Sequence, residues 1–465
     1  MQDGVRSDSG NEETLAEREE LGTQSRGMAP RSSHADWTPD PARPDPVTLV
    51  EQSNEDRIDW LVPTRRMRML ASPFAFFRGS PGLMAADLAG TPDSELSAQI
   101  NGDAHLLNFG FFSSPSRRLV FDINDCDETL VGPWEWDLKR LATSAVIGAR
   151  DLDFPKGTAT RAAHAAVLGY AKAMNDFADR GYLESWHTQL GVGELSPLLP
   201  KKRRRRISDV SPTAKARTRQ QALGKLAKVD GERLRIRNLS PLLVPVRRLE
   251  DKPEILQLQQ HWRTSLASYA DSLTNDTALL LGRYEFVDAA LKTVGVGSLG
   301  TRTVVVLGQG RDASDPLFLQ VREARRSSLE EYLPGQGLSP SERIVRGKRV
   351  LQAEPDIFLG MSAPVNGRGY YWRQLRDWKS SVRLERLGAM ELNRYANVCG
   401  WSLAHAHARS GDPVAIAAYI GSGRTLAGAI AEFAKRYAEQ NLADYQAYQQ
   451  AVADRSLEVA EADLE

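Results

Sequence analysis

The sequence contains little cysteine. Its 465 residues include only Cys126 and Cys399, too few for a disulfide framework or a cysteine-rich zinc site, which is typical of proteins from a reducing compartment. It also lacks the run of about 18 apolar residues that a transmembrane helix requires. The N-terminal residues are acidic and polar, unlike a signal peptide. The sequence therefore predicts a cytoplasmic globular protein with no membrane partner.

The chain has no excess of charge of either sign. Its 60 Lys and Arg residues balance its 60 Asp and Glu residues, so no global field favours nucleic acid or an anionic membrane. The basic run KKRRRR at 201–206 is a local exception. Because no aromatic residue interrupts it, this run is more typical of an exposed linker than of a nucleic-acid site. Nucleic acid is therefore not an expected partner.

The sequence pattern predicts an α+β fold behind a polar tail. Residues 1–45 are rich in Glu, Ser, Gly and Pro, which predicts disorder. We divide the rest into a largely helical part at 46–283, a strand-rich part at 284–380 and helices at 381–465. The individual elements that we expect are strands within 119–125, 284–310, 315–324 and 369–378 and helices within 132–151, 160–181, 213–229, 341–354, 391–411 and 425–461.

Oxygen-bearing side chains cluster in NGDAHLLNFG, residues 101–110, and in LVFDINDCDE, residues 119–128. Protein kinases space a catalytic Asp and a metal-binding Asn as Asp103 and Asn108 are spaced. Phosphoryl transfer needs a base for the attacking hydroxyl and oxygen ligands for Mg²⁺. Asp103 is thus a candidate base, and Asn108 and Asp125 are candidate metal ligands. Because Asp and Asn also cap turns and helices, a purely structural role remains open.

The neighbouring polar residues have simpler interpretations. On a strand, Asp122 and Asp125 point to opposite faces, so we do not expect them to share one ion. Asp127 and Glu128 are expected in a solvated turn or as a cap. His105 is more typical of a packed or hydrogen-bonded histidine than of a metal ligand.

A glycine-rich segment, VGVGSLGTR, contains Gly295, Gly297, Ser298 and Gly300. It lies between two predicted strands, whereas a dinucleotide-binding fingerprint lies between a strand and a helix. Glycines between two strands are typical of the kinase loop that covers the phosphates. The next strand, LFLQVREA, places Arg322 where a kinase carries its phosphate-pairing Lys. An ordinary β-hairpin is the alternative.

The acidic segments, with the following GPWEWDLKRLA, resemble the aminoglycoside phosphotransferase and choline kinase group. The resemblance implies that Asp103 is the base and that Asn108 and Asp125 hold the metal. It also implies that Asp137 is structural and ties the start of its helix to the catalytic loop. The sequence departs from that group only in the turn at 133–135.

The order of the motifs is the reverse of that in kinases, since the catalytic segment precedes the glycine loop. A circularly permuted, two-lobed protein-kinase-like fold would explain this order. The motifs together, over about residues 50–450, resemble the bacterial domain-of-unknown-function 2252 family, which is grouped with the kinase-like fold. Its members usually carry Lys where this chain has Arg322, and Arg is a wider, planar fork.

We therefore expect an ATP- and Mg²⁺-dependent phosphotransferase that acts on the hydroxyl of an unknown small molecule or protein. A catalytically weak nucleotide-binding pseudokinase or scaffold is the alternative that Arg322 suggests. A metal-dependent phosphohydrolase is third, because of Asp103-x-His105. Arg78 is a candidate for pairing an acidic substrate or for a structural ion pair. The candidates for the carboxylate that orients Arg322 are Glu330, Glu331 and Glu342.

Overall fold

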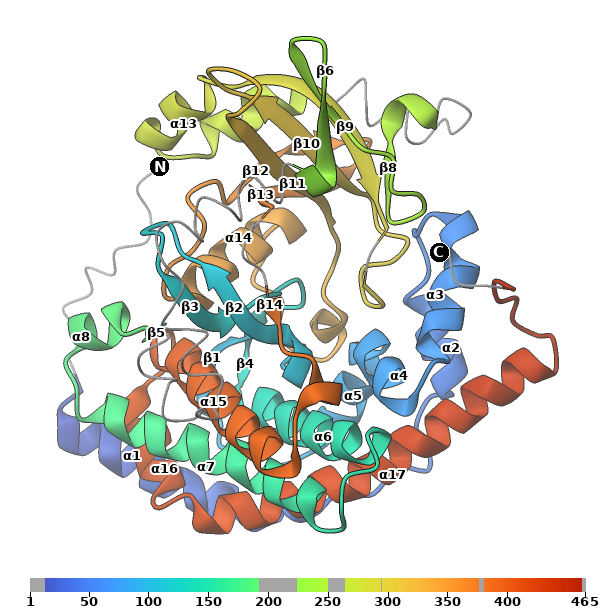
Figure 1. Ribbon diagram of the computed structural model, residues 1–465. Helices are drawn as coiled ribbons and strands as arrows, with labels where there is room; N and C mark the ends of the chain where they lie inside the picture. Colours follow the sequence, from blue (N-terminus) through green and yellow to red (C-terminus); the bar gives the residue numbers. More distant parts are fainter. Residues whose placement is uncertain (1–12, 192–223, 250–263, 294, 376–379, 462–465) are drawn as a thin grey trace.

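The computed structural model describes residues 13–191, 224–249, 264–293, 295–375 and 380–461. The described chain is a mixed α+β structure with several small sheets, as the sequence predicted (Figure 1). The basic run at 201–206, which we expected to be an exposed linker, and the first 12 residues of the predicted tail lie outside the described residues.

The largest sheet has six antiparallel strands and lies at the top of Figure 1. Val and Leu fill its central strands, which are buried on both faces, as continuous apolar runs predict. In spatial order the strands are β12 (Gly360–Val365), β13 (Arg368–Gln374), β11 (Pro316–Ala324), β10 (Thr303–Gln309), β9 (Glu285–Lys292) and β8 (Leu243–Pro245).

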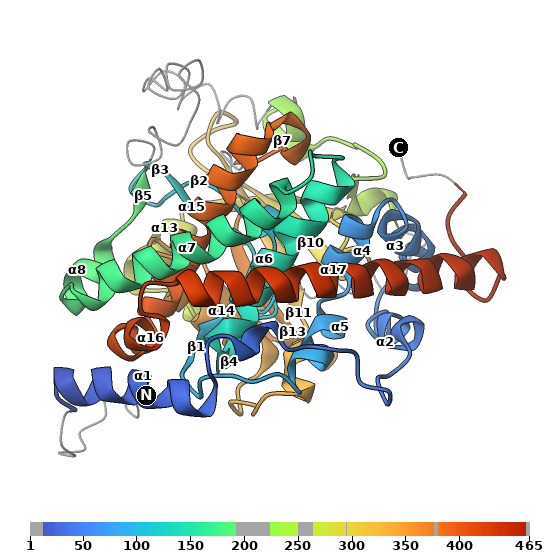
Figure 2. The ribbon, with the colours of Figure 1, turned by 90° about the horizontal axis from the view of Figure 1, so that it is seen from below.

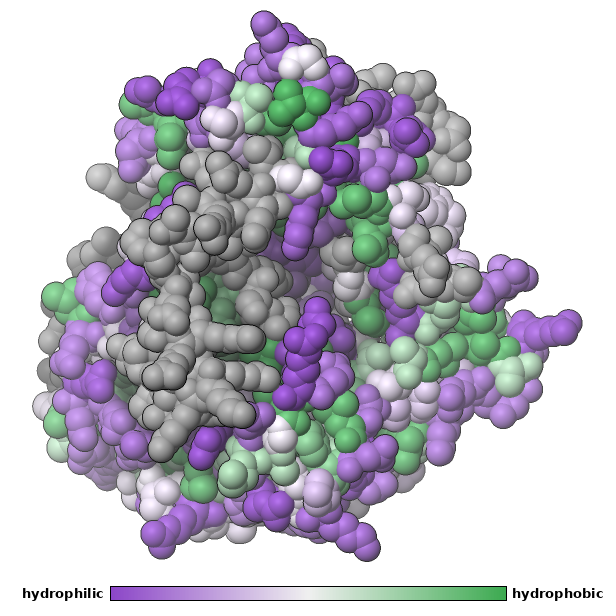
Figure 3. All heavy atoms as spheres, viewed as in Figure 1, coloured by the Kyte–Doolittle hydropathy of each residue, from purple (hydrophilic) through white to green (hydrophobic). Residues whose placement is uncertain are grey.

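Two short helices accompany this sheet, α13 (Asn275–Leu281) and α14 (Pro340–Leu351). Helix α14 begins at the capping residue Ser339 and packs against β11, β12 and β13. Hydrophilic residues cover most of the described surface on the face drawn in Figure 3, over the sheet and over the helices below it.

The opposite half of the molecule is helical, and its helices share one large hydrophobic core. Helix α17, of 30 residues, crosses nearly the whole width of the molecule in Figure 2. The helices of this half are α6 (Trp134–Asp151), α7 (Thr158–Ala178), α8 (Tyr182–His187), α15 (Ala389–Ala408), α16 (Pro413–Ile420) and α17 (Arg424–Ala453). Among the described residues, no single helix is long and apolar enough to cross a membrane. Helices α16 and α17 together have the length and apolar composition of a membrane span, but an angle of 83° separates them.

Two small sheets lie between the six-stranded sheet and the helices, and a third, two-stranded sheet lies at the top against β9 and β10 (Figure 1). One has the order β14 (Ser380–Ser381), β2 (Phe109–Ser113), β3 (Leu119–Ile123) and β5 (Leu190–Gly191). A second pairs β1 (Ser97–Ile100) with β4 (Leu130–Pro133), and a third pairs β6 (Ala227–Asp230) with β7 (Arg233–Ile236). The loops that connect β1, β2, β3 and β4 carry the acidic segments.

Four short helices from the first hundred residues pack beside the acidic segments. They are α2 (Pro46–Gln52), α3 (Val62–Met69), α4 (Pro73–Gly79) and α5 (Pro81–Leu88). Each has proline in its first turn, where the missing N–H costs no helical hydrogen bond. Single 3₁₀ turns complete the structure at η1 (Ser33–Ala35), η2 (Asp59–Leu61), η3 (Leu106–Asn108), η5 (Val246–Arg248), η6 (Ser328–Glu331) and η7 (Leu384–Arg386).

The prediction of a disordered tail is wrong for its described part, because helix α1 spans Leu15–Met28. Thr14 caps this helix with a capping box. Arg18 forms an ion pair with Asp412 at 2.6 Å, and the backbone of Gly22 lies directly against Ala415 of α16. The polar composition of this segment does not reveal these contacts. Helix α1 is held by charge pairing and close backbone packing and not by a broad apolar face.

A second difference concerns the helix predicted over 213–229. Of its described residues, 224–226 are helical, but 227–229 belong to β6, which forms a hairpin with β7. Gly231, at φ +63°, lies in the turn that joins the two strands. Long-range packing of this hairpin against β9 overrides the local helical tendency.

We predict that Gly22→Ala destabilises the docking of α1. The new Cβ would lie 2.0 Å from the carbonyl oxygen of Ala415, so α1 must move away from α16. The expected result is a loss of about 1–3 kcal/mol of stability and faster tryptic cleavage at Arg18 and Arg26. Gly27→Ala is the matched control, because a Cβ there meets no atom within 4 Å. Equal protection of α1 in both variants would contradict the proposed close contact.

Candidate functional site

The loop after β1 is held by a single buried carboxylate from α6. Asp137 Oδ2 accepts the N–H of Asn101 at 2.6 Å, and Oδ1 accepts the N–H of Gly102 at 2.9 Å. His407 lies 3.1 Å from the same carboxylate and contacts the hydroxyl of Tyr170. These contacts confirm the structural role predicted for Asp137, and they fix the backbone immediately before Asp103.

Asp103 is held in place by Arg140, one turn after Asp137 on the same helix. Arg140 Nη2 and Nε donate to Asp103 Oδ1 at 2.5 and 2.8 Å. The side-chain amide of Asn108 donates to the carbonyl oxygen of Asp103 at 2.7 Å, so the two candidate residues are in direct contact. Burial raises the pKa of Asp103 to about 6, and Arg140 opposes this shift.

His105 is a hydrogen-bonded, buried histidine, as the sequence predicted. Its Nδ1 accepts the N–H of Leu107 at 3.1 Å, and its Nε2 lies 3.6 Å from Asp103 Oδ2. Burial, reinforced by Arg78 and Arg140, holds the pKa of His105 well below its usual value. The imidazole is therefore neutral and helps to orient the loop.

Arg322, on β11, contacts two carboxylates after β3. Its Nη1 lies 3.0 Å from Asp125 Oδ2, and its Nη2 lies 2.6 Å from Asp127 Oδ2. Tyr371 donates its hydroxyl to Asp127 Oδ1 at 2.6 Å. Asp127 lies in a turn, as expected, but its carboxylate is directed toward the sheet and is only partly exposed to solvent.

These groups have opposite ionisation tendencies. Burial disfavours the charge of Asp125, but the nearby cations Arg322, Arg373 and Lys348 outweigh it and hold the pKa of Asp125 well below its usual range. Burial raises the pKa of Asp127 to about 6; Arg322 opposes this shift and the charge of Asp125 reinforces it. Asp125 is therefore the member of the pair that stays fully ionised at neutral pH.

Within the described structure, no hydrogen bond or ion pair joins Arg322 to any of the three predicted Glu partners. Glu330 lies 3.1 Å from Arg343 and 3.3 Å from Arg326 instead, and Glu342 pairs with Arg346. Glu331 only lines the cavity described below. The prediction failed because the carboxylates that neutralise Arg322 come from a loop about 200 positions away in the sequence, not from the segment that follows it.

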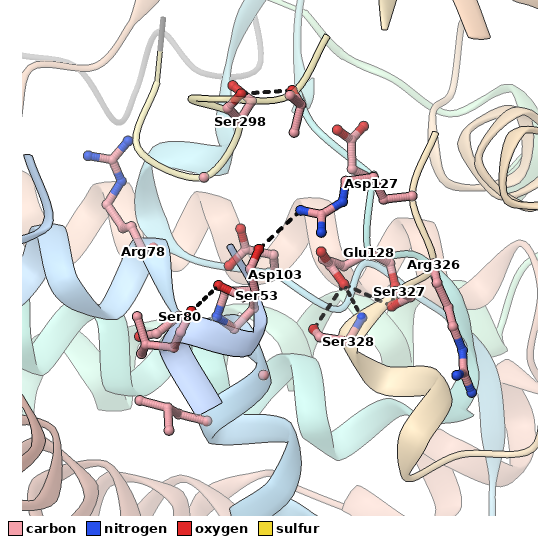
Figure 4. A pocket seen from close by; sticks show the side chains of 18 of the residues that line it. Ser53, Arg78, Ser80, Asp103, Asp127, Glu128, Ser298, Arg326, Ser327 and Ser328 are labelled. Atoms are coloured by element: carbon pink, nitrogen blue, oxygen red, sulfur yellow. Dashed lines mark hydrogen bonds between the residues drawn. The ribbon is translucent and has the colours of Figure 1, made fainter. Parts of the chain in front are cut away.

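Glu128 and Asp122 have structural roles. Glu128 Oε2 accepts the hydroxyl of Ser327 and both the N–H and the hydroxyl of Ser328, at 2.9, 2.7 and 2.9 Å, so it joins the loop after β3 to η6 (Figure 4). Asp122 is buried and accepts the N–H of Ala353 at 3.0 Å. Asp122 does not line the cavity that contains Asp125, in agreement with the prediction that the two do not share an ion.

The glycine loop lies between β9 and β10 and reaches over the acidic loops. Gly295 and Gly300 have φ of +85° and +87°, a conformation that favours glycine. Arg57 Nη1 donates to the carbonyl oxygen of Leu299 at 2.6 Å and fastens the loop to the N-terminal segment. A Cβ on Gly297 would lie 3.8 Å from the carbonyl oxygen of Arg78, which places the loop tip beside α4.

One cavity of about 320 Å³ joins these elements. Its lining includes most of the residues singled out in the sequence, namely Asp103, Asn108, Asp125, Gly297, Ser298 and Arg322. Gly295 and Gly300 are not among its lining residues and instead shape the loop on either side of Gly297 and Ser298. Figure 4 shows Asp103, Asp127 and Ser298 facing the same space from three different segments.

Three contributors were missed in the sequence: Arg140, Asp127 and Tyr371. A signal existed for Arg140, because Asp137 and Arg140 are three residues apart on a helix and thus share a face. Tyr371 and Asp127 meet only through the pairing of β13 with β11, which the sequence alone does not specify.

The oxygen donors available for a metal ion are few. Among the described residues, no group of three or more His, Cys, Asp or Glu side chains is arranged to hold a metal ion. Mg²⁺, however, usually takes only one or two protein carboxylates and completes its shell with water and phosphate oxygens. The ionised carboxylate of Asp125 and the amide oxygen of Asn108 are hard oxygen donors that line the same cavity. They therefore fit the one or two protein ligands that Mg²⁺ needs.

Residues 57–451 match the family described as uncharacterized protein conserved in bacteria (DUF2252). The chain belongs to this family. Searches of curated proteins and of solved structures gave no match. Membership of this uncharacterized family therefore assigns no activity to the chain, and the proposed function rests on the site.

We predict that Asp137→Ala strongly destabilises the protein, because it leaves the N–H groups of Asn101 and Gly102 buried without acceptors. The expected loss is about 3 kcal/mol or more, measured by urea unfolding. Asp176→Ala, at an exposed position on α7, should change stability by less than about 0.5 kcal/mol. Equal stability of the two variants would show that Asp137 does not organise the loop.

Proposed function

We propose that the protein is an ATP- and Mg²⁺-dependent phosphotransferase that transfers the γ-phosphoryl group to a hydroxyl acceptor. The observation that carries this proposal is the convergence of Asp103, Asn108, Asp125, Gly297 and Arg322 on one cavity. These residues come from segments separated by up to about 200 positions, so their proximity is a property of the fold and not of local sequence. Each has the chemistry that phosphoryl transfer requires of its position.

The arrangement of the six-stranded sheet supports a kinase-like fold. In protein kinases the glycine loop precedes a strand that carries the phosphate-pairing cation, and a helix follows. Here the glycine loop joins β9 to β10, Arg322 lies on β11, and α14 follows before β12 and β13. Because this unit comes after the acidic loops in sequence, we propose that the fold is circularly permuted, with two lobes on either side of the cavity.

In the proposed reaction, Asp103 accepts the proton of the acceptor hydroxyl. The hydroxyl oxygen forms a bond to the γ-phosphorus while the bond to the β,γ-bridging oxygen breaks, and ADP leaves with that oxygen. A base with a pKa of about 6 is ionised at neutral pH and retains basicity. Arg140 keeps Asp103 oriented, and Asn108 fixes the loop from the other side.

Asn108 and Asp125 would hold the metal ion. Mg²⁺, when bound, neutralises the phosphate oxygens. Arg322 offers a guanidinium to the phosphates from the sheet, and its contact with Asp125 keeps both groups at the cavity wall. Gly297 and Ser298 present backbone and hydroxyl donors at the tip of the glycine loop.

A catalytically weak nucleotide-binding scaffold is the second candidate. It is favoured by the pairing of Arg322 with both Asp125 and Asp127, which neutralises the carboxylate proposed to hold the metal. Binding of ATP without transfer would identify this function. No observation favours the third alternative, a metal-dependent phosphohydrolase, which would need a larger set of protein ligands than Asp103 and His105.

Calorimetric titration of Mg-ATP into the purified protein tests the nucleotide site. We expect saturable, Mg²⁺-dependent binding that weakens at least tenfold in Asp125→Asn, because the charged metal ligand is lost. Asp176→Asn is the matched control and should bind as the wild-type protein does. Absence of binding in folded wild-type protein would refute both the phosphotransferase and the nucleotide-binding scaffold.

The pKa of Asp103 predicts the pH dependence of transfer. The rate should rise about tenfold per pH unit up to pH 6 and then level off, because only the ionised carboxylate accepts the proton. Asp103→Asn should lower the rate by about 10²-fold or more and abolish this dependence. A profile that is unchanged in the variant would exclude Asp103 as the base.

The raised pKa of Asp103 affects stability in the opposite direction: the transfer rate rises with pH, whereas the stability falls. Folded Asp103 binds its proton more tightly than unfolded Asp does, so its contribution to stability is full below about pH 4 and is lost as the pH rises through about 6. The free energy of unfolding of Asp103→Asn, measured in urea, should therefore fall less than that of the wild-type protein between pH 4 and 6. Parallel curves for the two proteins would contradict the raised pKa.

A further inference from the structure

Six arginines line the cavity, and one of them differs from the other five. Arg57, Arg65 and Arg325 donate to backbone or side-chain oxygens of the N-terminal segment. Arg322 pairs with Asp125 and Asp127, and Arg326 pairs with Glu330. Arg78 makes no hydrogen bond or ion pair within the described parts of the chain, and its Nε is buried without a partner.

Arg78 lies between the glycine loop and the proposed base. Its carbonyl oxygen is the nearest atom to a Cβ built on Gly297, which places the residue beneath the loop tip. Its guanidinium lies 6.0 Å from the ring of Phe74, and Figure 4 shows it at the edge of the cavity, beside the glycine loop and directed away from Asp103. Asp103 is near enough to stabilise the charge of Arg78, although burial lowers the pKa of Arg78 overall.

Burying part of a guanidinium without an acceptor costs free energy, because its five N–H donors lose hydrogen bonds to water that the protein does not replace. The other cavity arginines bind protein oxygens: Arg65 also has a buried Nε without a partner, but its two Nη groups donate to Asn54 and Gly79. Arg78 is therefore the cavity arginine, among the described residues, whose whole guanidinium makes no hydrogen bond. Guanidinium groups match the geometry of carboxylate and phosphate oxygens. Arg78 is therefore built to receive an oxyanion from a ligand.

The rest of the cavity indicates the size and polarity of that ligand. A volume of about 320 Å³ is near the lower end of the roughly 300–1,000 Å³ typical of ligand pockets. Away from the glycine loop, its walls come from α2, α4, α5 and η6 and carry the hydroxyls of Ser53, Ser80, Ser327 and Ser328. The lining of this part also includes Glu128, Glu331 and Leu83, so it combines polar and apolar groups.

Resting on the proposed function, we propose that the acceptor is a small hydroxyl compound that also carries a carboxylate or phosphate, and that Arg78 binds this oxyanion. The hydroxyl of the same molecule would then lie at Asp103. Arg78 is in this proposal a specificity-determining residue, which selects acidic acceptors over neutral or cationic ones. The donor phosphates are assigned to Gly297, Ser298 and Arg322 and not to Arg78.

Binding of D-glycerate, glycerol 3-phosphate and neutral glycerol to the full chain, saturated with Mg-ADP, tests this assignment. We expect both anions to bind at least tenfold more tightly than glycerol, and Arg78→Gln to abolish the difference. Arg78→Lys should restore part of it, because charge is kept while the fork geometry is lost. Arg326→Gln is the matched control, since it removes an arginine that lines the same cavity but points away from it (Figure 4).

Four results would overturn the proposal: equal affinity of the wild-type protein for all three compounds, no binding of either anion, unchanged anion binding in Arg78→Gln, or an effect of Arg78→Gln on Mg-ADP alone. The last result would assign Arg78 to the donor phosphates. If the wild-type protein does not bind nucleotide, the proposed function fails, and the same titrations without nucleotide still report whether Arg78 binds oxyanions. A preference for only one of the two anions identifies which oxyanion the acceptor carries.

Discussion

The ion pairs of Arg322 join the two halves of the molecule at the cavity. Asp125 and Asp127 end the acidic segment, Arg322 lies in the middle of the six-stranded sheet, and 197 positions separate Arg322 from Asp125 in the sequence. A buried guanidinium is stable only when its charge is matched, so this contact fixes how the sheet sits over the acidic loops. This junction helps to hold the sheet so that the glycine loop and Asp103 line the same cavity.

Side chains that bind backbone groups maintain the geometry around this junction. Asp137 holds the loop before Asp103, and Arg343 donates to the carbonyl oxygens of Asp127 and Thr129. Arg57 holds the glycine loop in the same way. Irregular loops have no ladder of hydrogen bonds of their own, so these long polar side chains supply the missing partners for buried backbone groups. These bonds tie the irregular loops of the cavity to the helices and strands that form the rest of its walls.

Local pattern was enough to predict the longest elements of this fold. The apolar runs of β9, β10 and β11 and the long periodic helices α6, α7, α15 and α17 lie where the sequence placed them. The structural role of Asp137 followed from the motif around it. Asp127, the partners of Arg322 and the docking of α1 could not be predicted, because each depends on a contact between distant segments. Charge identifies a residue as polar, but it does not say which distant residue neutralises it.

The hydrogen bond between Arg57 and Leu299 also has a consequence for biosynthesis. The two residues are 242 positions apart, so at about 5–20 residues per second the ribosome makes Leu299 roughly 10–50 s after Arg57. During that interval Arg57, and the loops that contain Asp103 and Asp125, lack the sheet that completes them. The helical core can form earlier only in part, since α15 and α17 are made later still. The nascent chain therefore exposes its charged loops at least until Ile344, the last residue that lines the cavity, has been made.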